Sequence, residues 1–178
     1  MEIARRKTNI GARFLSFVLN EEEYCIEILK IKEIMGMTDV TEIPQTPDFI
    51  QGVINLRGKI IPIIDLRLKF EMKFKDYTSR TCIIVVELDY ENEITLMGLV
   101  VDSIQEVIPI AEDKINKVPY INAKIKSEYI KGIAETGEGI KIVLDIDRVL
   151  KEEEFVILQN LENAHIKAKE TTEKTGVK

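Results

Sequence analysis

The sequence is poor in the residues that most often build enzyme active sites and metal centres. Its 178 residues include one histidine, His165, and no tryptophan. A Ser–His or Cys–His nucleophile pair needs a histidine beside the nucleophile, and His165 falls in a predicted solvent-facing helix. A histidine-based metal site needs several such ligands. We therefore expect neither a metal ion nor histidine-dependent catalysis.

Cofactor-binding motifs are also missing. The chain has no GxxxxGK[ST] phosphate loop and no GxGxxG turn, which are the glycine-rich signatures of common nucleotide sites. The acidic runs Glu21-Glu22-Glu23 and Glu152-Glu153-Glu154 are typical of solvated turns and helix starts. We expect no cofactor.

Cysteine, proline and long apolar runs are scarce as well. Cys25 and Cys82 lie in apolar runs without a Cys or His at ligand spacing, which favours free thiols in a reducing cytoplasm. No run approaches the ~20 apolar residues of a membrane span. The N-terminal residues lack the apolar core of a signal peptide. We expect a cytoplasmic protein that does not insert into a membrane.

Positive charge is too sparse for a typical nucleic-acid binder. The net charge is -6 and the sequence pI is about 5.1, whereas phosphate binding needs a basic patch. The single basic triplet, Arg5-Arg6-Lys7, lies in residues 1–12, which lack a consistent hydrophobic period and are expected to form a flexible arm. No nucleic-acid partner is expected.

Short β-branched runs dominate what remains and predict an all-β fold. Apolar residues 14–19 and 24–26 flank a polar turn, and residues 53–56 and 59–64 flank Arg57-Gly58, so each pair predicts a β-hairpin. Residues 28–34 suit a half-buried strand, and Phe49–Gly52 suits a short helical turn.

The C-terminal segment has a different period. Phe155, Leu158 and Leu161 recur at helical spacing, with Ile166 a further candidate. We expect a C-terminal helix and tail over residues 156–178.

The second half of the chain repeats the first. Phe49-Ile50-Gln51-Gly52-Val53 corresponds to Tyr129-Ile130-Lys131-Gly132-Ile133, and Ile60, Asp65 and Leu66 correspond to Ile140, Asp145 and Ile146 at the same separation. This pattern indicates duplication of a small β unit with about five strands, which suits a closed barrel. We expect a first barrel near residues 13–80 and a second near 81–150, with possible strand exchange and a groove between them.

Two features of the repeat have alternative readings. Asp65 and Asp145 could form a carboxylate pair for catalysis, or each could end a strand and cap the next turn; capping is favoured. Arg57 occupies a tight turn that the second half replaces with Glu135-Thr136-Gly137-Glu138. It is either an ordinary hairpin residue or, as an exposed arginine beside apolar strands, an acquired recognition residue.

Several of these segments together resemble the CheW family. The signature is Phe49–Gly58 followed by Ile61–Arg67, supported by Tyr24–Ile28, Met97–Asp102 and Tyr129–Gly132, and the resemblance runs from about Phe14 to Phe155. It implies a CheW-like domain over residues 13–155, built from two SH3-like five-stranded β-barrels packed side by side. It also implies a non-enzymatic adaptor.

The resemblance implies two partners. They are the regulatory domain of the histidine kinase CheA and the cytoplasmic tip of methyl-accepting chemotaxis proteins. By the same resemblance, receptor binding is expected of Arg57, Asn55, Glu33, Ile31 and Ile28. Kinase binding is expected near Ile43 and Ile64.

Two other functions compete with the adaptor. An oligonucleotide-binding barrel would need aromatic and basic residues on one sheet face, which the acidic charge and 6% aromatic content disfavour. A small hydrolase would need an organised carboxylate site, which the sequence does not offer.

Overall fold

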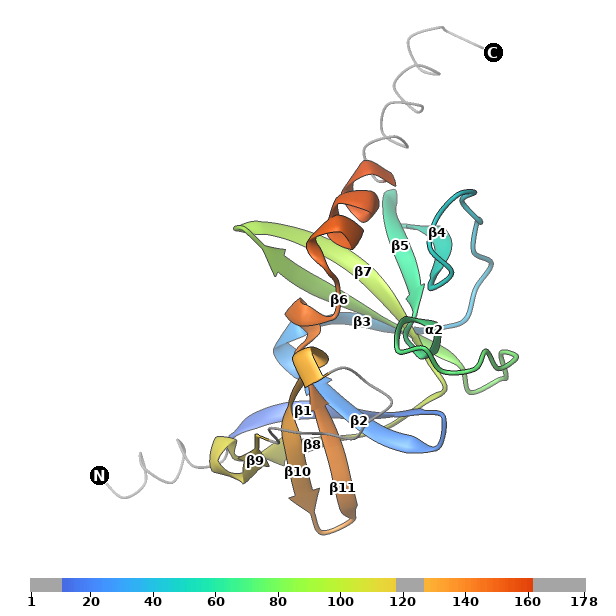
Figure 1. The fold of residues 1–178 in the computed structure, drawn as a ribbon. Helices are drawn as coiled ribbons and strands as arrows, with labels where there is room; N and C mark the ends of the chain where they lie inside the picture. Colours follow the sequence, from blue (N-terminus) through green and yellow to red (C-terminus); the bar gives the residue numbers. More distant parts are fainter. Residues whose placement is uncertain (1–10, 118–126, 162–178) are drawn as a thin grey trace, which may run out of the picture.

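Two β-sheets and a few short helices make up the computed structural model, which describes residues 11–117 and 127–161 (Figure 1). Sheet A has six strands in the order β8-β1-β2-β11-β10-β9, and sheet B has five in the order β3-β6-β7-β5-β4. The strands of sheet A are β1 (Ala12–Leu19), β2 (Glu22–Glu27), β8 (Ser103–Ile110), β9 (Ile115–Asn116), β10 (Ile130–Thr136) and β11 (Gly139–Leu144). Those of sheet B are β3 (Ile31–Gly36), β4 (Ile50–Leu56), β5 (Lys59–Asp65), β6 (Cys82–Tyr90) and β7 (Glu93–Val101). The all-β prediction with two small barrel-like units is confirmed.

Short helices connect the strands. They are η1 (Ile28–Lys30), α2 (Leu66–Lys69), η2 (Glu112–Lys114), η3 (Ser127–Tyr129) and η4 (Ile146–Arg148). A helix over residues 152–161 follows, and its Phe155 and Leu158 are buried while Leu161 is half-buried, as their spacing predicts. His165 and Ile166 lie outside the described residues. None of the helices in the described ranges is long and apolar enough to cross a membrane.

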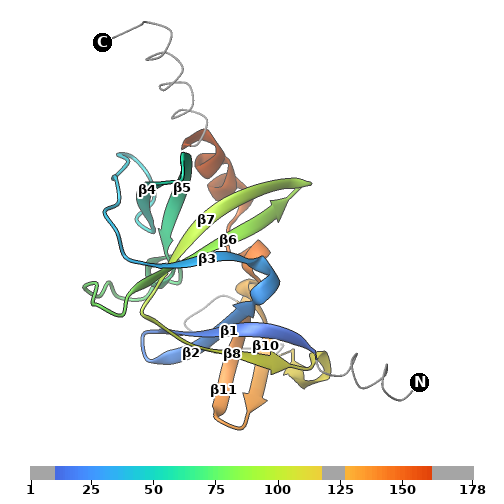
Figure 2. The same cartoon turned by 180° about the vertical axis from the view of Figure 1, so that it is seen from behind.

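The sheets divide the chain differently from the expected halves at residues 13–80 and 81–150. The β1–β2 hairpin joins sheet A by pairing with β8 and β11, whereas β6 and β7 pair with strands of sheet B. Sheet A therefore takes strands from both ends of the described chain, and sheet B takes the middle (Figure 2). The two connecting contacts, β2–β11 and β5–β7, are parallel, and parallel neighbours need long crossovers that local patterns do not reveal.

The internal repeat is visible as two equivalent hairpins. Asn55 on β4 pairs with Ile60 on β5, and Glu135 on β10 pairs with Ile140 on β11. Both hairpins have a register shift that ends at a glycine, Gly52 or Gly132. The prediction that Ile60 and Ile140 occupy equivalent strands is confirmed.

The expected helical turn at Phe49–Gly52 is wrong. Residue 50 already begins β4, and Gly52 has a φ of 142° at the bulge. A Cβ at Gly52 would lie 2.0 Å from the carbonyl oxygen of Thr41. Gly52 therefore marks a close backbone approach within a strand, which is a common use of glycine there.

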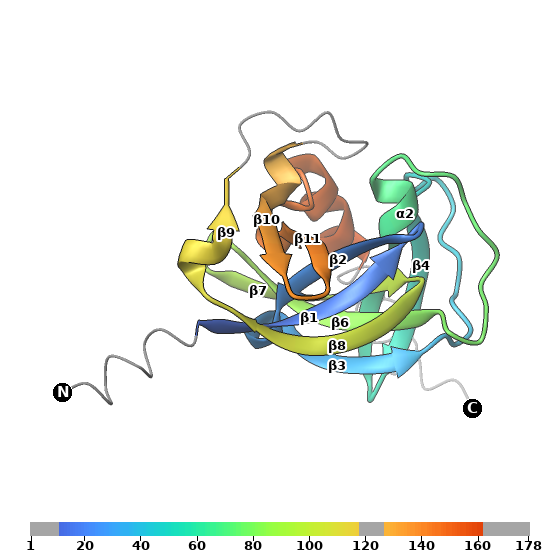
Figure 3. The ribbon, with the colours of Figure 1, turned by 90° about the horizontal axis from the view of Figure 1, so that it is seen from below.

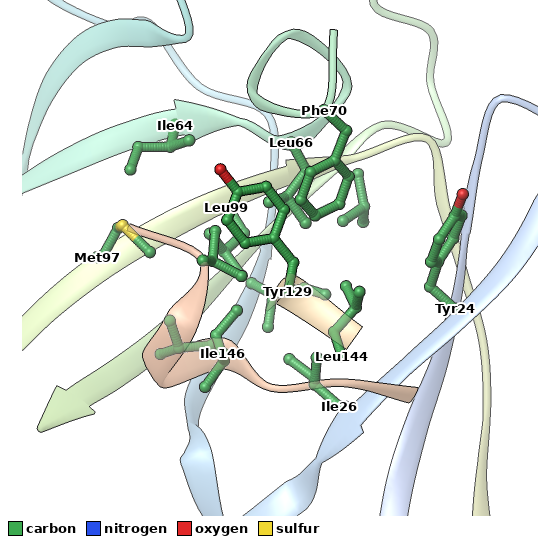
Figure 4. Close-up of a cluster of buried hydrophobic side chains, with 14 of the residues drawn as sticks. Tyr24, Ile26, Ile64, Leu66, Phe70, Met97, Leu99, Tyr129, Leu144 and Ile146 are labelled. Carbon is green, nitrogen blue, oxygen red and sulfur yellow. The ribbon is translucent and has the colours of Figure 1, made fainter. Parts of the chain in front are cut away.

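The core lies mainly between the two sheets. One buried cluster of 22 residues takes side chains from β1 and β2 of sheet A and from β5, β6 and β7 of sheet B. Figure 4 shows part of it, with Tyr24 and Ile26 of β2 on the same core as Met97 and Leu99 of β7. The clusters confined to one side contain 6 and 5 buried residues. A buried Leu or Ile contributes roughly 1.5–3 kcal/mol to the free energy of unfolding, so most of the apolar stabilisation comes from the cluster that both sheets share. We therefore expect the two units to unfold together.

Ionic contacts fix the C-terminal helix and the exchanged hairpin. Lys69 on α2 is buried, with its Nζ 2.7 Å from Glu154 Oε2 of the helix. Lys141 on β11 is fully buried and donates to Glu23 on β2 at 2.7 Å. Cys25 and Cys82 are free thiols.

Candidate functional site

An ion pair joins two of the residues that the sequence nominated for partner binding. Arg57 Nη1 donates to Glu33 Oε2 and Nη2 to Glu33 Oε1, both at 2.8 Å. The Arg57 side chain is 75% exposed and that of Glu33 is 26% exposed. The pair links the β4–β5 turn to β3, which is an edge strand of sheet B.

The backbone at this turn suits glycine or asparagine better than arginine. Arg57 and Gly58 both have positive φ, at 52° and 85°, as expected for a two-residue hairpin turn of type I′. A non-glycine residue in this region carries conformational strain, which Glu21 in the β1–β2 turn and Glu91 in the β6–β7 turn share, with φ of 74° and 49°. Arg57 is therefore not explained by the requirements of the turn.

Asn55 has a local structural role in the same turn. Its Oδ1 accepts a hydrogen bond from the Gly58 N–H at 2.9 Å. The contact closes the turn and holds Arg57 at the tip. Asn55 is exposed, so a contact with a partner is also sterically open to it.

Ile28 and Ile31 lie where the sheets meet. Ile28 starts η1 and Ile31 starts β3, and both are half-buried against the shared core. η1 packs against β1 of sheet A and β6 of sheet B, so it bridges the two sheets, which Figure 3 shows with sheet A in front. The segment from Ile28 to Glu33 therefore leads from the junction of the sheets to the ion pair.

Sequence reasoning missed Leu29, which lies between these residues. Leu29 is 86% exposed, and Ile34 on β3 is 44% exposed. In the sequence both belong to one apolar run, so their exposure could not be separated from the burial of their neighbours. Because Leu29 lies in η1, at the start of the segment that leads to Glu33, its exposure makes it a candidate interface residue.

The two residues expected to bind the kinase differ in exposure. Ile64 on β5 is fully buried in the shared core and cannot be a surface contact in this fold. Its prediction as a contact is wrong, because β5 is covered on both faces. Ile43 is half-buried in the segment between β3 and β4, where its carbonyl oxygen accepts a hydrogen bond from Thr46 Oγ1.

Asp65 and Asp145 serve as caps in separate places. Asp65 accepts from the Arg67 N–H at the start of α2, and Asp145 accepts from the Asp147 N–H at η4. Asp65 also pairs with the buried Arg67 guanidinium at 3.0 Å. The capping prediction is confirmed, and the geometry gives no support to a catalytic carboxylate pair.

Arg67 is the centre of a buried ionic cluster. Its Nη1 lies 3.0 Å from Asp102 Oδ1, while Asp102 Oδ2 accepts from the Asn20 N–H in the β1–β2 turn. Burial disfavours the charged guanidinium, but the hydrogen bonds and charges of Asp65, with the charge of Asp102, raise the pKa of Arg67 overall. The cluster connects α2 to the exchanged hairpin. Within residues 11–117 and 127–161, no group of three or more His, Cys, Asp or Glu side chains is placed to hold a metal ion.

Comparison with known proteins identifies the family. The model described as the CheW-like domain matches residues 13–154. The chain is 40% identical to the chemotaxis protein CheW of Klebsiella aerogenes over 156 residues, covering 88% of this chain and 92% of that protein. It is 33% identical to the chemotaxis protein CheW of Treponema pallidum over 149 residues, covering 84% and 88%.

A solved structure agrees with this match. The scaffolding protein TtCheW from Thermoanaerobacter tengcongensis superimposes with a TM-score of 0.72 at 35% identity, covering 81% of this chain and 90% of that one. The chain belongs to the CheW-like family.

Proposed function

We propose that this protein is a non-enzymatic cytoplasmic adaptor that couples methyl-accepting chemoreceptors to the histidine kinase CheA. The observation that carries the proposal is the exposed Arg57–Glu33 pair on a strained turn, in a member of a family whose relatives are named as chemotaxis and scaffolding proteins. The capping roles of Asp65 and Asp145 further support a non-catalytic function.

The proposed receptor surface combines the ion pair with the apolar segment that precedes Glu33 in the chain. A guanidinium has five N–H donors, and Glu33 accepts from two of its nitrogens while the side chain stays 75% exposed. Glu33 therefore orients Arg57 while leaving further donors for a polar or acidic group on a receptor helix. Such prior orientation lowers the entropy lost on binding.

The apolar part of this surface is Ile28, Leu29 and Ile31. Leu29 is the most exposed large apolar side chain in the described residues, and its two neighbours are half-buried. Arginine is enriched among interface hot spots, and the exposed Leu29 adds apolar area to the segment that leads to Glu33. Receptor contact at η1 would therefore lie at the junction of the two sheets.

The proposed kinase surface lies on sheet B near Ile43. Ile43 is half-buried in the segment after β3, and this segment pairs with β4 through Thr41 and Val53. We propose that the kinase domain, which has a related fold, packs against this side through exposed strand and loop residues with a polar rim.

Co-sedimentation tests the proposal with the full chain. A receptor cytoplasmic fragment assembled on vesicles is mixed with the regulatory domain of the kinase, with and without this protein. The kinase domain should sediment in larger amount when the protein is present, because the adaptor contacts both partners. Binding to only one partner, or no increase in sedimented kinase, contradicts the coupling function.

A further inference from the structure

The loop between α2 and β6 exposes two aromatic rings. Phe74 is 52% and Tyr77 is 36% exposed, and they are the only aromatic side chains among the exposed large hydrophobic residues of the described chain. Figure 1 shows this loop, in green, extending beyond α2 and away from sheet A. Exposed aromatic residues are enriched in protein interfaces.

The rings are held in place by buried groups beneath them. The Arg67 Cζ lies 5.6 Å from the centre of the Phe74 ring and 5.5 Å from that of Tyr77. The two rings meet edge to face at 5.8 Å. Tyr77 donates its hydroxyl hydrogen to Gln51 Oε1 at 3.1 Å. Because Arg67 is itself fixed by Asp65 and Asp102, the rings rest on a rigid support.

Hydrogen bonds also order the end of this loop. The Thr81 N–H donates to the Thr78 carbonyl oxygen at 3.2 Å, and the Thr78 N–H donates to Thr81 Oγ1 at 2.8 Å. Loops that are long and internally bonded are common sites of function.

The charge around the rings is opposite to that of the protein as a whole. Lys73, Lys75 and Arg80 are exposed cations, and Asp76 is the single anion between them. The full chain carries a net charge of -6. Cations beside exposed rings favour an acidic partner by charge complementarity.

This surface is separate from the Arg57 site. Tyr77 is bonded to Gln51 near the start of β4, whereas Arg57 follows the end of β4. A strand rises about 3.3 Å per residue, so the two sites lie roughly 20 Å apart at opposite ends of the β4–β5 hairpin.

We propose that Phe74 and Tyr77, flanked by Lys73, Lys75 and Arg80, form a docking surface for an acidic protein segment that carries aromatic or aliphatic side chains. The rings bind the apolar side chains, and the cations bind the carboxylates. Basic and aromatic residues can also bind single-stranded nucleic acid. The two rings meet edge to face with an interplanar angle of 60°, so they do not present the series of open ring faces on which successive bases stack.

Fluorescence anisotropy at low salt tests the surface in the full chain. The probes are a labelled peptide that alternates acidic residues with leucine and phenylalanine, the same peptide with lysine replacing each acid, and a labelled oligothymidylate. The acidic peptide should bind, and raising the salt concentration should weaken it. No binding of the acidic peptide, or binding of either other probe as tightly, overturns the proposal.

Variants locate the binding. Phe74→Ser should lower the affinity for the acidic peptide about fivefold or more. The double change Lys73→Glu and Lys75→Glu should have the same effect. The matched control is Ile94→Ser, which removes a side chain that is 68% exposed on β7 and should leave binding unchanged. Equal affinity of wild type and Phe74→Ser, with both folded by circular dichroism, contradicts the assignment.

Discussion

The two repeat hairpins share a scaffold but differ at their tips. In β4–β5 and β10–β11, the glycine at the bulge and the aspartate at the end of the second strand are retained. The Asp65 and Asp145 N–H groups donate to the equivalent carbonyls of Phe49 and Tyr129 at 2.9 and 3.0 Å. The first tip presents Arg57, bound by Glu33. The second has Gly137 at the corresponding place. The retained positions stabilise the barrel, and the divergent tip marks the proposed recognition site.

The retained aspartates also differ in what they support. Asp65 and its partner Arg67 are both fully buried, whereas the side chains of Asp145 and its partner Arg148 are 35% and 72% exposed. The first repeat therefore has a buried ionic cluster where the second has only a surface cap. The equivalence of the repeats is thus one of backbone geometry, while their energetics differ.

The largest expected effect follows from this difference. Asp65→Ala leaves the buried Arg67 guanidinium with Asp102 alone and should destabilise the protein by about 3–5 kcal/mol. Asp145→Ala removes a cap and should cost about 0.5–2 kcal/mol. Urea unfolding of both variants measures the two losses. Equal losses would show that the repeats are energetically equivalent as well.

Substitution of the bulge glycines should also destabilise the first repeat more than the second, but by a smaller margin than substitution of the aspartates. Gly52→Ala places a Cβ against the backbone of Thr41 at a positive φ and should cost about 3 kcal/mol. Gly132→Ala has no such φ, and its Cβ would meet Ile115 Cγ2 at 2.6 Å and Asn116 O at 2.8 Å. It should cost about 1–3 kcal/mol. Thermal unfolding compares the two variants, and a larger loss of stability for Gly132→Ala would show that Gly52 is not the more constrained position.

A weak pH dependence should distinguish the second tip. The pKa of Glu106 is raised, mainly by a hydrogen bond with Glu138 and further by burial and the negative charge of Glu138. The positive charge of Lys141 acts in the opposite direction and only partly offsets this. An acid with a raised folded-state pKa binds more protons when folded, so this contribution to stability decreases as the pH rises through the interval between the unfolded and folded pKa values. Glu138→Gln should lower the Glu106 pKa toward its ordinary value.

Carbon-detected NMR titration of the Glu106 carboxyl group measures that change. The pH dependence of stability due to Glu23 has the opposite sign, because its hydrogen bond with Lys141 lowers the pKa of Glu23. Its stabilising contribution is therefore lost only as the pH falls through this lowered value. An unchanged Glu106 titration in Glu138→Gln would rule out the proposed contact.

Local features of this fold could be predicted from the sequence. The hairpin at Arg57-Gly58 and the caps at Asp65 and Asp145 depend on residues close together in the chain. The equivalence of Ile60 and Ile140 follows from the internal repeat of such local patterns. Turn chemistry and short-range periodicity are sufficient for such features. The site residues Arg57 and Glu33 were each named by family resemblance, although their mutual pairing was not.

Long-range features could not be predicted. Strand exchange was expected as a possibility, but the strands involved could not be named, because the exchange of the β1–β2 hairpin into sheet A depends on parallel pairing of Tyr24 with Ile142, which leaves no local pattern. Ile64 was misplaced because residues 61–65 of β5 are buried on both faces, so the strand lacks the alternation that separates core from surface. Exposure of Phe74 and Tyr77 depends on the position of Arg67 beneath them.

The most direct test compares Arg57→Ala with Lys59→Ala, a neighbouring exposed cation on β5. The measurement is the affinity of each variant for the receptor cytoplasmic fragment, with the free energy of unfolding and kinase-domain affinity recorded alongside. Arg57→Ala should weaken receptor binding about tenfold or more, equivalent to ~1.4 kcal/mol, while stability changes by less than ~0.5 kcal/mol and kinase binding is retained. Lys59→Ala should leave all three unchanged. If Arg57→Ala unfolds the protein, or weakens receptor and kinase binding alike, Arg57 is a structural residue and the proposed coupling site is wrong.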